Sequence, residues 1–123
     1  MSIAHFTLAT RDVAGSQDFF ANTMGWKPIS HPGNIITEVA WLRIAPGQEL
    51  HLLYVPGFEP SEFEREFGRH FAIEYPLEKF DQLKQRLVEQ GAELIEPARE
   101  TPFERFFFRD PNGYVFEVVD TGR

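Results

Sequence analysis

Three histidines and one glutamate recur at matching places in the chain and are the residues best suited to bind a metal ion. His70 follows His5 by 65 positions, and Glu117 follows His51 by 66. Imidazole nitrogens and carboxylate oxygens are common ligands of iron, nickel, cobalt, manganese and zinc. Their recurrence at nearly the same interval therefore predicts a duplicated structure in which both halves supply ligands to one metal site.

Strand alternation predicts that these four residues share the polar side of their sheets. Neighbouring side chains in a strand point to opposite faces. Alternation places His5 on the face opposite Phe6 and Leu8, and it places Glu117 on the face opposite Phe116. The apolar side is expected to carry a helix, and small residues beside the histidines indicate a concave polar face.

The elements that must position these residues are predicted twice. The first copy is a strand, a helix capped by Asp12 and three strands, over residues 3–10, 13–24, 26–30, 35–45 and 49–55. The second copy repeats this order over residues 69–75, 76–90, 93–96, 103–109 and 114–120. The fold class is therefore α+β, with two tandem βαβββ modules forming a curved mixed sheet around a metal site. One domain, 1–123, would contain modules at about 1–56 and 69–123, joined by connector 57–68.

Composition excludes several classes of function. The formal net charge is -7, from 19 acidic against 12 basic residues, and no cluster of lysine and arginine could follow a phosphate backbone. Nucleic acid is therefore not an expected partner. The absence of cysteine excludes thiolate ligands and a cysteine nucleophile. No apolar run approaches the length of a membrane span or a secretory signal, so a cytoplasmic location without membrane association is expected.

Other polar segments are weaker candidates for a site. No glycine-rich phosphate loop or serine nucleophile motif is present. His31 lies in a predicted turn and is interpreted as structural. The acidic run 62–67 could form a lid helix, but a solvated surface is favoured and no catalytic role is assigned to it. Three arginines are candidates for contact with an anionic substrate: Arg43, Arg105 and Arg109. For Arg109, an ion pair with its neighbour Asp110 is the favoured explanation.

Several motifs resemble those of the vicinal oxygen chelate superfamily, which includes glyoxalase I, extradiol dioxygenases, fosfomycin-resistance enzymes and bleomycin-binding proteins. They are His5-Phe-Thr-Leu-Ala, Phe19-Phe20 through Met24-Gly25, Glu49-Leu-His-Leu-Leu-Tyr, His70-Phe-Ala-Ile and Phe108-Arg-Asp-Pro-Asn-Gly-Tyr-Val-Phe-Glu117. The resemblance covers nearly the whole chain. It implies one divalent metal ion bound by His5, His51, His70 and Glu117. Bacterial glyoxalase I is similar in size and ligand layout, but it usually has a carboxylate at the place of His51.

The resemblance also implies a type of reaction. A glyoxalase-like lyase or isomerase would use the metal to stabilise an enediolate-type intermediate of a small-molecule substrate, with Glu117 as the base. An iron-dependent extradiol-type dioxygenase is the alternative, with His5, His70 and Glu117 as ligands and His51 outside the metal sphere. A third possibility is a drug-binding protein without turnover, similar to bleomycin-resistance proteins. In each case a homodimer is expected.

Overall fold

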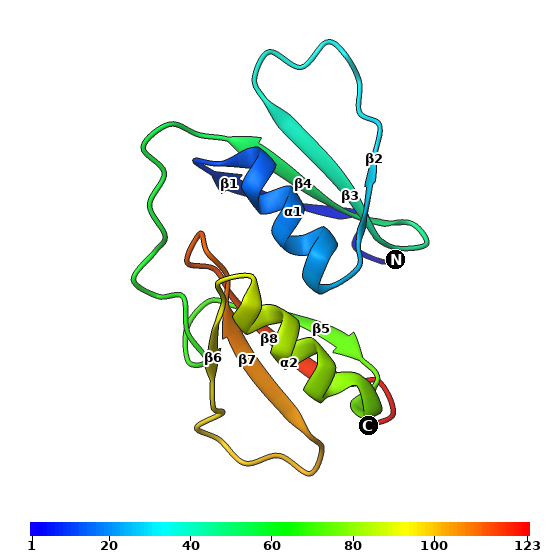
Figure 1. The fold of residues 1–123 in the computed structure, drawn as a ribbon, viewed down its shortest axis with the longest axis vertical. Coiled ribbons are helices and arrows are strands. Elements are labelled where there is room, and N and C mark those ends of the chain that lie inside the picture. The colour runs from blue at the N-terminus through cyan, green and yellow to red at the C-terminus, as the bar shows by residue number, and fades with distance from the viewer. The chain divides into compact units, whose positions relative to one another are not determined.

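The computed structural model describes residues 1–123, which form two compact units, Met1–Phe58 and Glu59–Arg123. Each unit has the order βαβββ and a four-stranded mixed sheet (Figure 1). The predicted duplication and the α+β fold class of two βαβββ modules with mixed sheets are therefore confirmed. The two units are described separately below.

The first unit contains β1 (His5–Thr10), α1 (Val13–Thr23), β2 (Lys27–Ile29), β3 (Val39–Ala45) and β4 (Gln48–Tyr54). Its strand order is β1-β4-β3-β2. Strand β4 pairs in parallel with β1 and antiparallel with β3, so it is an internal strand. A parallel pair requires a long crossover connection, and here α1, β2 and β3 all lie between the two strands in the sequence.

The second unit contains β5 (Phe71–Tyr75), a 3₁₀ turn η1 (Leu77–Lys79), α2 (Phe80–Glu89), β6 (Glu93–Ile95), β7 (Arg105–Arg109) and β8 (Val115–Asp120). The strand order β5-β8-β7-β6 reproduces that of the first unit. Strand β8 is internal, parallel to β5 and antiparallel to β7. The last strand of each unit therefore has neighbours on both sides, which fixes the facing of its side chains.

Helix α1 begins where the sequence predicted. Asp12 is its N-cap, and the Oδ1 atom of Asp12 accepts a hydrogen bond from Gly15 N at 2.9 Å. Such a cap stabilises a helix by about 1 kcal/mol. On the buried side of α1, Phe20 is fully buried and its ring stacks on that of Trp26, with centroids 5.4 Å apart. The apolar side of the sheet thus carries the helix, as expected (Figure 1).

The second unit has an aromatic core between its two central strands. Phe108 and Phe116 are cross-strand neighbours, both fully buried, with stacked rings 5.1 Å apart. Phe106 makes an edge contact with Phe80 of α2 at 5.2 Å. Burying one such side chain contributes roughly 1.5 to 3 kcal/mol, so this core fixes the position of β8.

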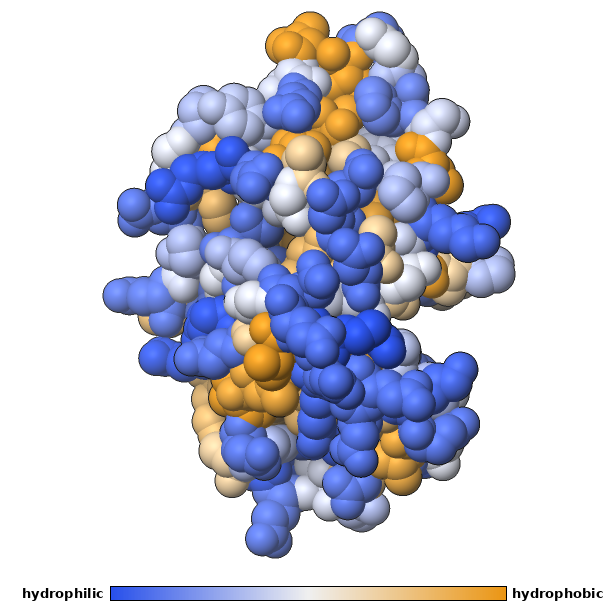
Figure 2. Space-filling model, in the orientation of Figure 1, coloured by the Kyte–Doolittle hydropathy of each residue, from blue (hydrophilic) through white to orange (hydrophobic).

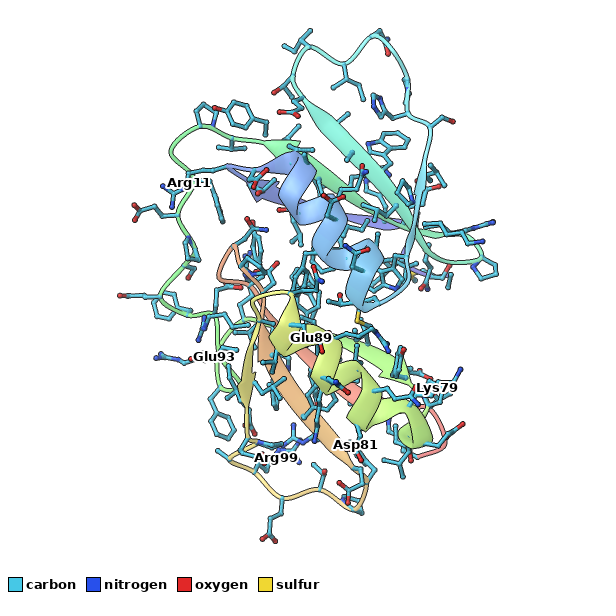
Figure 3. All side chains as sticks on the ribbon, in the orientation of Figure 1. Arg11, Lys79, Asp81, Glu89, Glu93 and Arg99 are labelled. Carbon is cyan, nitrogen blue, oxygen red and sulfur yellow. The ribbon has the colours of Figure 1, made fainter.

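Hydrophilic residues cover most of the face drawn in Figure 2, with smaller hydrophobic areas among them. Exposed charged residues of η1 and α2 contribute to the hydrophilic surface of the second unit, among them Lys79, Asp81 and Glu89, which are labelled in Figure 3. No helix is both long enough and apolar enough to span a membrane.

One predicted strand begins later in the structure than expected. Strand β3 begins at Val39 rather than at residue 35, and the fully exposed Ile36 lies in the preceding loop. The second compact unit begins at Glu59, so residues 59–68 are described with it. There Pro60 packs against the turn before β8, where Gly113 has φ of 101° and a Cβ would lie 2.5 Å from Pro60 Cγ. Glycine is therefore required at this close approach.

Asp110 makes the second unit sensitive to pH. Its side chain is buried, and burial raises its pKa from 3.8 to about 6, although hydrogen bonds from Tyr114 and Asn112 act in the opposite direction. Because the folded state prefers the protonated form, the contribution of Asp110 to stability is present below pH 3.8 and is lost as pH rises through about 6.

We therefore expect Asp110→Asn to change the pH dependence of stability. The amide oxygen can still accept from the N–H groups of Asn112 and Tyr114, at 3.0 and 2.8 Å in the present structure. Relative to the variant, the unmodified protein should lose about 2 kcal/mol of unfolding free energy between pH 4 and pH 7. Urea denaturation of both proteins across this range measures the difference. Parallel pH profiles would contradict the assignment.

Candidate functional site

The first unit brings His5 and His51 together in a ring stack. His5 is the first residue of β1, and His51 lies in the middle of β4. Their rings are 4.0 Å apart between centroids and inclined by 16°. Trp41 covers the other face of His51 at 3.8 Å and 4°, from the directly opposite position of β3. His51 is thus enclosed between two rings on the polar side of the sheet.

The imidazole of His51 is also held at its edge. Nε2 of His51 lies 2.8 Å from Oε1 of Glu49, the residue that shares its face two positions earlier. A metal ion lies close to the plane of the imidazole that binds it, along the nitrogen lone pair. Two nearly parallel rings do not direct their lone pairs to one point. Binding of one ion by both His5 and His51 therefore requires one ring to turn.

The second unit brings together His70 and Glu117. His70 immediately precedes β5, and Glu117 is in the middle of β8. Nε2 of His70 lies 3.3 Å from Oε1 of Glu117. Adjacent donors around one metal ion are about 3.0 to 3.4 Å apart when the ligand bonds are about 2.1 Å long. This pair therefore has the spacing of two neighbouring ligands.

The contact of the other ring nitrogen of His70, Nδ1, determines whether Nε2 has a lone pair for binding a metal. Nδ1 lies 3.3 Å from the carbonyl oxygen of Arg65, which can only accept a hydrogen bond. When Nδ1 donates to this oxygen, the neutral ring carries a lone pair on Nε2. Nε2 and Oε1 of Glu117 are then two acceptors facing each other, and a shared proton or a metal cation between them would stabilise the arrangement.

Arg105 binds the second oxygen of the Glu117 carboxylate. Nη1 of Arg105 donates to Oε2 of Glu117 at 2.9 Å, and Nη2 donates to Oε2 of Glu66 at 3.0 Å. Burial by itself lowers the pKa of Arg105, but its hydrogen bonds to the two carboxylates outweigh this and raise the pKa. The cluster holds two carboxylates against one guanidinium and so carries one uncompensated negative charge, which favours a cation nearby.

Glu66 was not predicted to take part in the site. Its carboxylate accepts hydrogen bonds from the backbone N–H groups of Ala98 and Arg99, at 2.7 and 3.1 Å. Burial raises the pKa of Glu66, but these bonds and Arg105 together lower it below its ordinary value. Figure 3 labels Arg99 in the loop after β6, so Glu66 connects this loop with the segment before β5.

The interpretation of residues 62–67 as a solvated acidic surface is therefore wrong for two of its glutamates. The side chain of Glu64 is fully buried and pairs with Arg69 at 2.8 Å, and only 12% of the Glu66 side chain is exposed. Glu64 pairs with Arg69 and Glu66 pairs with Arg105, and the acidic run by itself gives no indication of either partner. Only Glu62 of the acidic residues in this run is exposed.

The remaining candidates have structural contacts. Arg109 pairs with Glu93 at 3.4 Å and donates to the Gly113 carbonyl at 3.1 Å, so the predicted pair with Asp110 is wrong. His31 contacts the Pro32 carbonyl at 3.0 Å, and its ring lies 6.2 Å from that of Trp41 at a tilt of 53°. Neither unit alone gathers three histidine, aspartate or glutamate side chains in the arrangement of a metal site.

Known structures share this fold. A protein from Bacillus anthracis that is provisionally assigned to the glyoxalase family is 27% identical, with a TM-score of 0.76 over 98% of this chain and 94% of that one. A variant of the fosfomycin resistance protein FosX from Listeria monocytogenes, in complex with Mn(II) and 1S,2S-dihydroxypropylphosphonic acid, is 18% identical, with a TM-score of 0.78. The comparison with FosX covers 97% of this chain and 91% of that one.

Sequence comparison agrees with the structural one. Glyoxylase I 4 from Arabidopsis thaliana is 27% identical over 125 residues, which cover 97% of this chain and 70% of that protein. Residues 2–118 match the model of a single family, and this match includes all four candidate ligands. The chain belongs to the Glyoxalase/Bleomycin resistance protein/Dioxygenase superfamily.

Proposed function

We propose that this protein is a metal-dependent enzyme, a glyoxalase-like lyase or isomerase that acts on a small oxygenated substrate. The proposed ligands of its single divalent ion are His5, His51, His70 and Glu117. The proposal includes a homodimer, and the ligands of one ion come from both halves of one chain or from two chains. Glyoxylase I 4 of Arabidopsis thaliana supports this reaction class at 27% identity.

The spacing of the His70 and Glu117 donors carries the proposal. Nε2 and Oε1 lie 3.3 Å apart, while backbone and arginine contacts engage the far side of each group. Without a metal ion, Nε2 of His70 and Oε1 of Glu117 would have to share a proton to lie at this distance. A divalent ion would satisfy both acceptors and also offset the uncompensated charge of the Arg105 cluster.

The residues of this chain would have distinct roles in the proposed reaction. When bound, the metal supplies positive charge that stabilises an oxyanion developing on the substrate. His70 is oriented by the Arg65 carbonyl, and Glu117 by Arg105. Because Oε2 already accepts from Arg105, Oε1 of Glu117 would serve as the metal donor and, once released from the ion, as the base that moves a proton between substrate carbon atoms.

A second candidate function is an iron-dependent extradiol-type dioxygenase. The observation that favours it is the engagement of His51 by Trp41, His5 and Glu49. If His51 stays in the stack, His5, His70 and Glu117 make up a set of two histidines and one carboxylate, which is typical of oxygen-using iron enzymes. In this case the role of His51 would be to orient its neighbour.

Metal analysis and two assays test these functions. We expect purified protein to contain close to one transition-metal ion per chain, and metal-reconstituted protein to isomerise a hemithioacetal. Oxygen uptake with catechols by the iron-loaded protein would instead support the dioxygenase. A protein that binds drug-like ligands without metal or turnover would falsify both.

Light scattering of the same sample tests the homodimer, which a compact monomer binding one ion would contradict.

A further inference from the structure

We infer that Glu66 and Arg105 are positioning residues that hold Glu117 with Oε2 engaged and Oε1 presented to a metal ion as a single donor. The inference rests on the proposed role of Glu117 as a ligand. It extends the site to residues 62–67, which contain no candidate ligand. Neither residue touches the substrate or the metal in this proposal, and each acts through the carboxylate of Glu117.

The first step is the contact between Arg105 and Glu117. The donor Nη1 lies 2.9 Å from Oε2, and the side chains are only 3% and 11% exposed. Rotating the carboxylate to bind an ion through both oxygens would break this charge-assisted hydrogen bond in a poorly solvated place. Oε1, which faces His70, is therefore the oxygen that remains available.

The second step is the fixing of the guanidinium itself. Nη2 of Arg105 donates to Glu66 Oε2 at 3.0 Å and to the Arg99 carbonyl oxygen at 2.6 Å. Stacking against Phe107 at 5.2 Å restricts the plane of the guanidinium. These contacts come from three separate segments, so the guanidinium has one well-defined orientation.

The third step is the anchoring of Glu66. Its two carboxylate oxygens accept from consecutive backbone N–H groups, those of Ala98 and Arg99. The backbone of a loop is thereby connected, through Glu66 and Arg105, to the candidate ligand on β8. Groups that orient metal ligands in this way commonly change metal affinity by 10- to 100-fold when they are replaced.

Binding of Mn(II) to metal-free protein tests the inference directly. We expect Glu66→Gln to weaken the binding of Mn(II) by about 10- to 100-fold. Electron paramagnetic resonance of the free ion measures the binding. The amide introduces donors where backbone N–H groups and Arg105 already donate, so one contact must be lost. Arg105→Lys retains the charge but not the two-pronged geometry and should weaken binding by at least as much.

Controls separate positioning from general destabilisation. Glu62→Gln, an exposed acid in the same segment, should leave Mn(II) affinity unchanged. Asp110→Asn perturbs the same unit away from Glu117 and should also leave the affinity unchanged. Circular dichroism of each metal-free variant verifies that the fold is present at the assay temperature, and Glu66→Asp provides a milder change if Glu66→Gln fails to fold.

The possible failures are distinguishable. If unmodified protein binds Mn(II) and Glu117→Gln abolishes binding, but folded Glu66→Gln and Arg105→Lys bind as tightly as the unmodified protein, then the positioning role is overturned and the proposed function stands. If Glu117→Gln does not alter Mn(II) binding, or if no Mn(II) is bound, then the proposed function fails and the inference fails with it.

Discussion

Replacement of Arg105 by methionine is expected to lower the free energy of unfolding of the metal-free protein by about 3 to 5 kcal/mol. The substitution preserves an apolar stem of similar length but leaves Glu66 and Glu117 without their cation. Both carboxylates are nearly buried, with side-chain exposures of 12% and 11%, so water can compensate only in part. Chemical denaturation at neutral pH measures the loss.

Arg43→Met is the matched control for this prediction. Arg43 is an exposed arginine on β3, and its replacement should change the unfolding free energy by no more than about 0.5 kcal/mol. Equal effects of the two substitutions would show that the cluster around Arg105 contributes little to stability. Restored stability on combining Arg105→Met with neutral residues at Glu66 and Glu117 would support the charge argument.

Removal of a candidate ligand is expected to have the second large effect. Alanine at His5, His70 or Glu117 should weaken Mn(II) binding roughly 100-fold each. This estimate divides about 10 to 16 kcal/mol, the binding free energy of structural zinc sites, among four ligands, which gives about 2.5 to 4 kcal/mol for each one; the lower end of this range applies to the more weakly bound Mn(II). Titration of the metal-free variants measures the change, and His31→Ala serves as a control at a histidine that is not a candidate ligand.

The effect of His51→Ala distinguishes the two candidate functions. A four-ligand site predicts the same roughly 100-fold loss as for the other ligands. A loss clearly smaller than that caused by His5→Ala would place His51 outside the metal sphere and favour the three-ligand dioxygenase. Glu49→Gln adds to this comparison, because weakening the contact to Nε2 should release His51 and strengthen metal binding only if His51 is a ligand.

The fold followed from local patterns in the sequence. The Asp12 cap, the helix-ending glycines and the alternation in the strands all depend on residues close in sequence, so the order and facing of the elements were predictable. The beginning of β3 was not, because residues 35–38 have apolar members that the structure leaves in a loop. Tertiary pairing, rather than propensity, sets that boundary.

The site was only partly predictable for a similar reason. Each unit brings its two candidate ligands within contact distance, as strand facing and the repeat implied. The partners of these residues were missed, since Trp41 reaches His51 through strand register and Glu66 reaches Arg105 across 39 positions. Glu49 was the exception that could have been found, because it shares a strand face with His51 two residues later.

The parallel pairing of β1 with β4 has a consequence for synthesis of the protein on the ribosome. Strand β1 ends at Thr10, but its partner is complete only at Tyr54. At roughly 5 to 20 residues per second, the nascent chain would carry β1 without its partner for about 2 to 9 seconds. During this interval the apolar side of the strand is available to chaperones or to other nascent chains, and the same delay recurs for β5 until β8 emerges.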